Sequence, residues 1–132
     1  MSLEPRPTVV DAPKGPQPRG PYTPAVRAGD FVFLSGQIGL SPETGELVDG
    51  GVQEQARQTL ANVAAILEGA DLTVRDIARA VIYLSDISNW GAVNEVYTEF
   101  FDGVALPART AIAVAGLPLG ALVEIEVTAL AR

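Results

Sequence analysis

Residues 122–130 read Leu-Val-Glu-Ile-Glu-Val-Thr-Ala-Leu, so that apolar and polar side chains alternate. Because successive side chains of a β-strand point to opposite faces of the sheet, this pattern predicts a strand. The residues at odd positions from 123 to 127 then form an apolar face, and Glu124 and Glu126 lie on the other face. We expect the apolar face to meet helices. The glutamate face must meet solvent, a ligand or a partner subunit.

The rest of the chain predicts an α+β sandwich around this strand. Apolar residues recur at three- and four-residue spacing in residues 51–69 and again from Ser88 or Asn89 to about Phe101, which indicates two helices. The expected element order is β-β-β-α-β-α-β-β, an about six-stranded sheet with both helices on one face. The other strands are expected at residues 8–10, 22–26, 31–38, 77–84 and 109–115.

The strand that precedes residues 122–130 carries a candidate binding residue. In Pro-Ala-Arg-Thr-Ala-Ile-Ala-Val, residues 107–114, the side chain of Arg109 shares a predicted face with alanines. Thr110, Ile112 and Val114 are then expected to point toward the core. A guanidinium among methyl groups leaves room for a small planar anion such as a carboxylate, which it binds with two parallel hydrogen bonds. A solvated arginine at the sheet edge is the alternative from spacing alone.

The composition excludes several classes of function. The 132 residues include no cysteine and no histidine, which excludes disulfides, zinc hydrolases, Ser-His-Asp hydrolases and cysteine proteases. A net charge of −7 argues against nucleic acid as a partner. No apolar run approaches the roughly 18 residues of a membrane helix, and the N-terminus lacks the apolar core of a signal peptide, so we expect a cytoplasmic protein with no membrane partner.

Length and hydropathy bear on domain count and assembly. A chain of 132 residues is expected to form a single domain over residues 1–132, with a poorly ordered N-terminus at residues 1–6. The mean hydropathy of +0.24 is high for a lone domain of this size, which indicates apolar surface buried between subunits.

Three segments carry a resemblance to a known family. They are Phe-Leu-Ser-Gly-Gln-Ile at residues 33–38, Val-Asn-Glu-Val-Tyr at 93–97 followed by Phe100-Phe101, and Pro-Ala-Arg at 107–109 followed by Glu-Ile-Glu at 124–126. From about residue 7 to 131, the chain resembles the Rid family of reactive intermediate deaminases, also called YjgF-type or RidA-type proteins.

The resemblance implies a chorismate-mutase-like α+β fold and a homotrimer with three sites between subunits. It also implies an activity, the hydrolysis of enamines and imines such as 2-aminoacrylate to a 2-keto acid and ammonia, which serves metabolite detoxification. These small carboxylate-bearing substrates are released by enzymes that use pyridoxal phosphate. The resemblance implies that the protein itself needs no cofactor, and we expect no metal.

Two residues match catalytic positions of the family. Glu124 matches the acid that orients or activates water, and Tyr22, in Gly-Pro-Tyr at residues 20–22, matches a tyrosine of the cleft. The chemistry agrees, since without histidine or cysteine a carboxylate assisted by a hydroxyl is the natural proton shuttle. Desolvation on the sheet face would raise the pKa of Glu124. From spacing alone, a solvated charge on the sheet face is favoured over a catalytic role for Glu124.

Five further residues match substrate-binding positions. Arg109 matches the arginine that binds the substrate carboxylate, and Asn94 matches an asparagine of the deaminase-active members. Ser35 and the backbone of Gly36 match the polar wall of the pocket. Ala111 stands where many members carry cysteine, at a position where the family uses mainly the backbone amide, and its side chain excludes thiol-based regulation there.

Several readings remain open. The chain can instead be a trimeric binding module that holds a small carboxylate metabolite without converting it, a ribonuclease or translation inhibitor, or a pathway-specific Rid deaminase. To act on one ligand, Arg109 and Glu124 must also lie close together. If the last two strands formed a hairpin, Arg109 would lie several residue pairs from Glu124, too far for direct contact at a rise of about 3.3 Å per residue.

Overall fold

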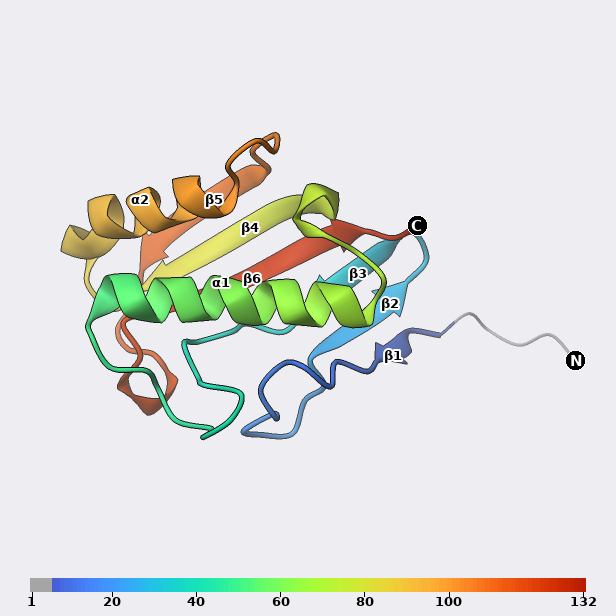
Figure 1. The fold of residues 1–132 in the computed structure, drawn as a ribbon, viewed down its shortest axis with the longest axis horizontal. Helices are drawn as coiled ribbons and strands as arrows, with labels where there is room; N and C mark the ends of the chain where they lie inside the picture. Colours follow the sequence, from blue (N-terminus) through green and yellow to red (C-terminus); the bar gives the residue numbers. More distant parts are fainter. Residues whose placement is uncertain (1–5) are drawn as a thin grey trace, which may run out of the picture.

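Six strands form one mixed sheet, and two helices cover one of its faces in the computed structural model (Figure 1). The structure describes residues 6–132, so the expectation of a poorly ordered N-terminus falls outside the described residues except at Arg6. The element order agrees with the predicted α+β order. The elements are β1 (Thr8–Val10), β2 (Ala25–Ala28), β3 (Phe31–Leu34), α1 (Val52–Gly69), β4 (Ile77–Leu84), α2 (Trp90–Phe100), β5 (Ala108–Ala113) and β6 (Val123–Leu130).

The sheet order is β1-β2-β3-β6-β4-β5, which places β6 near the centre. Neighbouring strands run antiparallel except β4 and β5, which are parallel because α2 connects them as a crossover. The last two strands are therefore not a hairpin, and β4 lies between them. This order sets how far apart the residues of β5 and β6 lie across the sheet.

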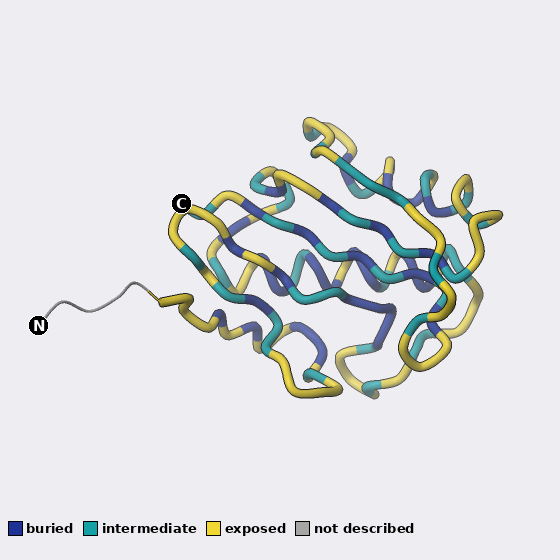
Figure 2. Tube along the Cα trace, turned by 180° about the vertical axis from the view of Figure 1, so that it is seen from behind, coloured by how far each residue is buried: buried dark blue, intermediate teal, exposed yellow. Residues whose placement is uncertain are grey.

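The faces of β6 are as predicted. Val123, Ile125 and Val127 are buried under the helices, and the side chains of Glu124 and Glu126 lie on the opposite, open face. Figure 2, seen from behind, shows buried residues alternating with partly buried ones along the strands, as expected for a sheet with one covered and one open face. The core therefore lies between the sheet and the two helices.

Arg109 and Ala111 share a face of β5 as predicted, but the prediction that the opposite face meets the core is wrong. Arg109 pairs with Ala80 of β4, which is fully buried beneath the helices, so Arg109 and Ala111 face the helical side. Ile112 lies on the open face and is 43% exposed. Both faces of β5 carry apolar residues, so its side-chain pattern does not identify the core side. Pairing with β4 determines which face of β5 meets the helices. That face carries alanines, whose small side chains fit beside α2.

The ends of the helices depend on local geometry. Helix α1 ends at Gly69, where the predicted helix also ends, and glycine at this position permits a close approach, because a Cβ there would overlap the carbonyl oxygen of Asp11. Helix α2 begins directly after Asn89, one of the two residues at which its start was expected, but the side chain of Asn89 makes no capping hydrogen bond. The side chain of Asp86 caps the short 3-10 turn Ile87–Asn89 that precedes α2, where it accepts a hydrogen bond from Ser88 N at 2.9 Å. Within residues 6–132, no helix combines the length and apolarity needed to cross a membrane.

Candidate functional site

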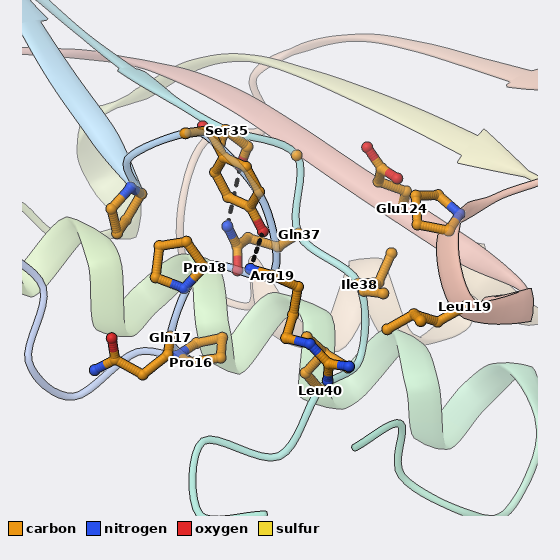
Figure 3. A pocket seen from close by; sticks show the side chains of 14 residues that line it. Pro16, Gln17, Pro18, Arg19, Ser35, Gln37, Ile38, Leu40, Leu119 and Glu124 are labelled. Carbon is orange, nitrogen blue, oxygen red and sulfur yellow. Dashed lines mark hydrogen bonds between the residues drawn. The ribbon is translucent and has the colours of Figure 1, made fainter. Parts of the chain in front are cut away.

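A cavity of about 480 Å³ opens at one end of the sheet, where three connecting segments meet (Figure 3). These segments are the proline-rich loop before β2, the chain that leaves β3, and the loop between β5 and β6. Glu124 is the one residue of β6 in its wall. The lining residues are Pro16, Gln17, Pro18, Arg19, Tyr22, Pro24, Ser35, Gly36, Gln37, Ile38, Leu40, Pro118, Leu119 and Glu124.

The carboxylate of Glu124 lies directly against the backbone of Gly36. The two segments are joined by hydrogen bonds between Gln37 and Ile125, with N–O distances of 2.8 and 2.9 Å. A Cβ at position 36 would overlap Oε2 of Glu124 and lie 3.0 Å from its Cδ. The Glu124 carboxylate can therefore lie here only because residue 36 has no Cβ. This is a steric reason for glycine in the Ser-Gly-Gln segment.

Burial is the main influence on the protonation of Glu124. Partial desolvation raises its pKa above the ordinary 4.5, and the nearby charge of Glu126 raises it further. Tyr83 pairs with Glu124 across β4 and β6, and its hydroxyl group donates a hydrogen bond to the carboxylate of Glu126. None of the ion pairs within residues 6–132 involves Glu124. Glu124 therefore exchanges a proton closer to neutral pH than an exposed glutamate does.

Two hydroxyl groups in the same wall differ in the hydrogen bonds that they can offer a ligand. Ser35 Oγ donates to the carbonyl oxygen of Thr23 at 2.6 Å, so toward the cavity this oxygen can only accept. Tyr22 is 44% exposed, and its hydroxyl oxygen accepts from the backbone N of Arg19 at 3.1 Å, which leaves the phenolic proton available as a donor. The cavity thus combines a donor, an acceptor and a proton-exchanging carboxylate.

Arg109 lies elsewhere, among aromatic rings of α2. Its Cζ atom is 4.9 Å from the ring centroid of Tyr97 and 5.7 Å from that of Trp90. Asn94 follows Trp90 by four residues and precedes Tyr97 by three, so it shares this side of α2. Ala111 is the next residue on the same face of β5. The predicted site residues are therefore in two groups, with Tyr22, Ser35, Gly36 and Glu124 at the cavity and Arg109, Asn94 and Ala111 near α2.

The two groups do not meet within one chain. Arg109 pairs with Ala80, which pairs with Val127, so Arg109 lies two strands away from β6 and three residues away from the level of Glu124. That places the two Cα atoms about 10 Å apart across the sheet and about 10 Å apart along it. Their side chains also point to opposite faces. Arg109 of one chain therefore cannot bind a ligand that touches Glu124 of that chain.

Sequence reasoning missed two buried polar residues of α1 that hold the cavity wall. Asn62, 1% exposed, donates to the carbonyl oxygens of Ile38 and Leu40 at 3.1 and 2.9 Å. Gln55 accepts from Leu122 N at 2.8 Å through its side-chain oxygen. A signal was present, since both polar residues occupy core-facing positions of the helical pattern, where a polar group requires a partner.

The sequence comparisons cover almost the whole chain. A family model described as Endoribonuclease L-PSP matches residues 12–131. A RutC family protein of Pyrococcus horikoshii is 44% identical over 121 residues, which are 92% of this chain and 95% of that protein. A Mus musculus protein named 2-iminobutanoate/2-iminopropanoate deaminase is 43% identical over 121 residues, 92% of this chain and 89% of that protein.

The structural comparison agrees with these matches. The crystal structure of E. coli TdcF with bound serine superposes with a TM-score of 0.90 at 38% sequence identity. The superposition covers 95% of this chain and 99% of that chain. The similarity therefore includes the cavity segments as well as the sheet and helices.

Proposed function

The chain belongs to the endoribonuclease L-PSP family, the YjgF/Rid proteins, and we propose that it is an enamine/imine deaminase. It converts the imine of a 2-amino acid, such as the tautomer of 2-aminoacrylate, to a 2-keto acid and ammonia. Mammalian relatives at 40–43% identity carry the name 2-iminobutanoate/2-iminopropanoate deaminase. The proposal includes a homotrimer, a cytoplasmic location and a role in removing reactive metabolites.

The observation that carries the proposal is the half-buried Glu124 carboxylate in the cavity wall, with a raised pKa. A general acid–base group works best when its pKa lies near the working pH. The protonated carboxyl group first gives its proton to the imine nitrogen, and the resulting carboxylate accepts a proton from water as the water oxygen bonds to the imine carbon, which gives a carbinolamine. That second proton then passes to the amino group, and the carbon–nitrogen bond breaks as ammonia leaves. The carboxylate takes the remaining hydroxyl proton as the carbonyl forms, which restores the starting acid.

A second copy of the chain supplies the carboxylate anchor in this proposal. Arg109 keeps its guanidinium on the helical side of the edge strand β5, outside the cavity of its own chain. The open sheet face carries exposed apolar side chains that suit burial against other copies, including Phe31, Phe33 and Ile112. In a closed cyclic assembly, each cavity then receives Arg109 from a neighbour. The serine bound in E. coli TdcF shows that this relative accommodates an amino acid.

The test is a coupled assay. A dehydratase that uses pyridoxal phosphate generates 2-aminoacrylate, and pyruvate release is followed with and without this protein. We expect the protein to accelerate release, and Glu124→Gln to lower kcat by about 10²- to 10⁴-fold. Glu43→Gln removes an equivalent charge from an exposed loop outside the cavity and serves as the matched control. If the protein does not accelerate pyruvate release, the deaminase proposal is wrong and the binding-module alternative is favoured.

A further inference from the structure

Arg19 is the one positively charged residue in the wall of the cavity, and Glu124 is the one negatively charged residue there, among the residues that the structure describes. In Figure 3, Ile38 lies between Glu124 and the side chain of Arg19, and Leu119, also in the cavity wall, is seen beside Ile38. The cavity thus carries a cation that the deaminase chemistry at Glu124 does not use.

Backbone contacts hold Arg19 in place. Its own N–H donates to the hydroxyl of Tyr22 at 3.1 Å, and its Nη1 donates to the carbonyl oxygen of Gly45. Prolines at positions 16, 18 and 21 restrict the loop around it. Among residues 6–132, no carboxylate forms an ion pair with Arg19. A guanidinium has five N–H donors, so most of them remain for a ligand, and the positive charge is not neutralised by the protein.

We propose that Arg19 binds a second anionic group on the substrate, which makes imino acids with an acidic side chain a preferred substrate class. This rests on the proposed deaminase function, in which Arg109 of a second copy binds the carboxylate next to the imine. Ile38 and Leu119 then contact the methylene groups between the imine carbon and the distal carboxylate. Because the chain carries a net charge of −7, a doubly charged substrate needs such a local cation.

The experiment compares two imines made in the assay by amino-acid oxidases with catalase present. Glutamate oxidase supplies 2-iminoglutarate, and an alanine-oxidising enzyme supplies 2-iminopropanoate. Remaining imine is trapped with semicarbazide. The variants are Arg19→Gln and Arg19→Glu. Arg27→Gln is the matched control, since Arg27 is also exposed and also donates to a glycine carbonyl, that of Gly29, but lies outside the cavity. Thermal unfolding of each variant reports its folding.

We expect Arg19→Gln to lower kcat/KM for 2-iminoglutarate about tenfold, mainly through KM, because a charge-assisted pair is lost at a partly solvated site. Arg19→Glu should lower kcat/KM for 2-iminoglutarate further. In both variants, kcat/KM for 2-iminopropanoate should change by no more than about twofold. Arg27→Gln leaves both substrates unchanged. The charge reversal tests binding directly, because a merely structural role of Arg19 would lower kcat/KM for both imines by similar factors.

The other possible results distinguish failure of the inference about Arg19 from failure of the proposed deaminase function. Equal losses for both imines would overturn the inference, because Arg19 would then hold the loop or bind the carboxylate next to the imine. No change for either imine, or a wild-type protein that hydrolyses only 2-iminopropanoate, would also overturn it while leaving the deaminase function intact. Hydrolysis of neither imine by the wild-type protein would instead refute the proposed function.

Discussion

Two inactive variants should restore activity to each other if each site uses Arg109 from one copy and Glu124 from another. Arg109→Met removes the charge but keeps a flexible side chain beside Tyr97 and Trp90. Glu124→Gln removes the proton-exchanging group. In a mixed assembly, a complete site takes Glu124 from an Arg109→Met subunit and Arg109 from a Glu124→Gln subunit. At equal mixing, each condition is met half of the time, so about a quarter of the sites regain both residues.

The assay mixes the two variants in denaturant at several ratios, refolds them together and follows pyruvate release. Activity should peak at equal proportions near one quarter of the refolded wild-type value and fall toward either pure variant. Each variant refolded alone and the two mixed after separate refolding are the controls. If the co-refolded mixture shows only the summed activities of its parents while wild-type protein recovers, the site lies within one chain and the argument from strand order is wrong.

Three further predictions concern the same residues. Arg109→Lys should lower kcat/KM about 30- to 1000-fold in steady-state kinetics, because lysine keeps the charge but loses the planar pair of hydrogen bonds, worth about 2–4 kcal/mol. Because burial raises the pKa of Glu124, the folded protein binds more protons than the unfolded chain just above pH 4.5, and stability falls as pH rises through that window. Glu124→Gln should therefore raise Tm at neutral pH, with little effect near pH 4 in calorimetry. Gly36→Ala should lower kcat with the fold retained by circular dichroism, since its Cβ displaces the Glu124 carboxylate; an unchanged kcat would contradict that placement.

The alternation of residues 122–130 was sufficient to predict β6 and its two faces, because a strand with one polar face can be buried in only one way. The pattern of β5 was not sufficient. Alanines alternate there with Thr110 and Ile112, so either face can be buried, and the outcome depends on pairing with β4 and on the cover that α2 provides. Local sequence does not contain that information.

The candidate site shows the same limit of local patterns. Gly36 and Glu124 are 88 positions apart in the sequence but touch, because the chain that leaves β3 pairs with β6 at Gln37 and Ile125. Arg109 and Glu124 are much closer in sequence but lie on opposite faces with β4 between them. Tyr22 and Ser35, which the family resemblance assigns to the site, line the same cavity. Strand order determines which of the remaining residues can join them in one chain.

The polar side chains that α1 buries have a consequence for ligand affinity. Asn62 attaches the wall segment Ile38–Leu40 to helix α1, and Gln55 attaches Leu122, which directly precedes β6. The wall at Ile38 and Leu40 therefore cannot open locally without breaking buried hydrogen bonds. The conformational entropy of these segments is lost when the chain folds rather than when a ligand arrives. A small ligand, which has few atoms with which to offset an ordering cost, therefore meets a receptor that is already arranged for it.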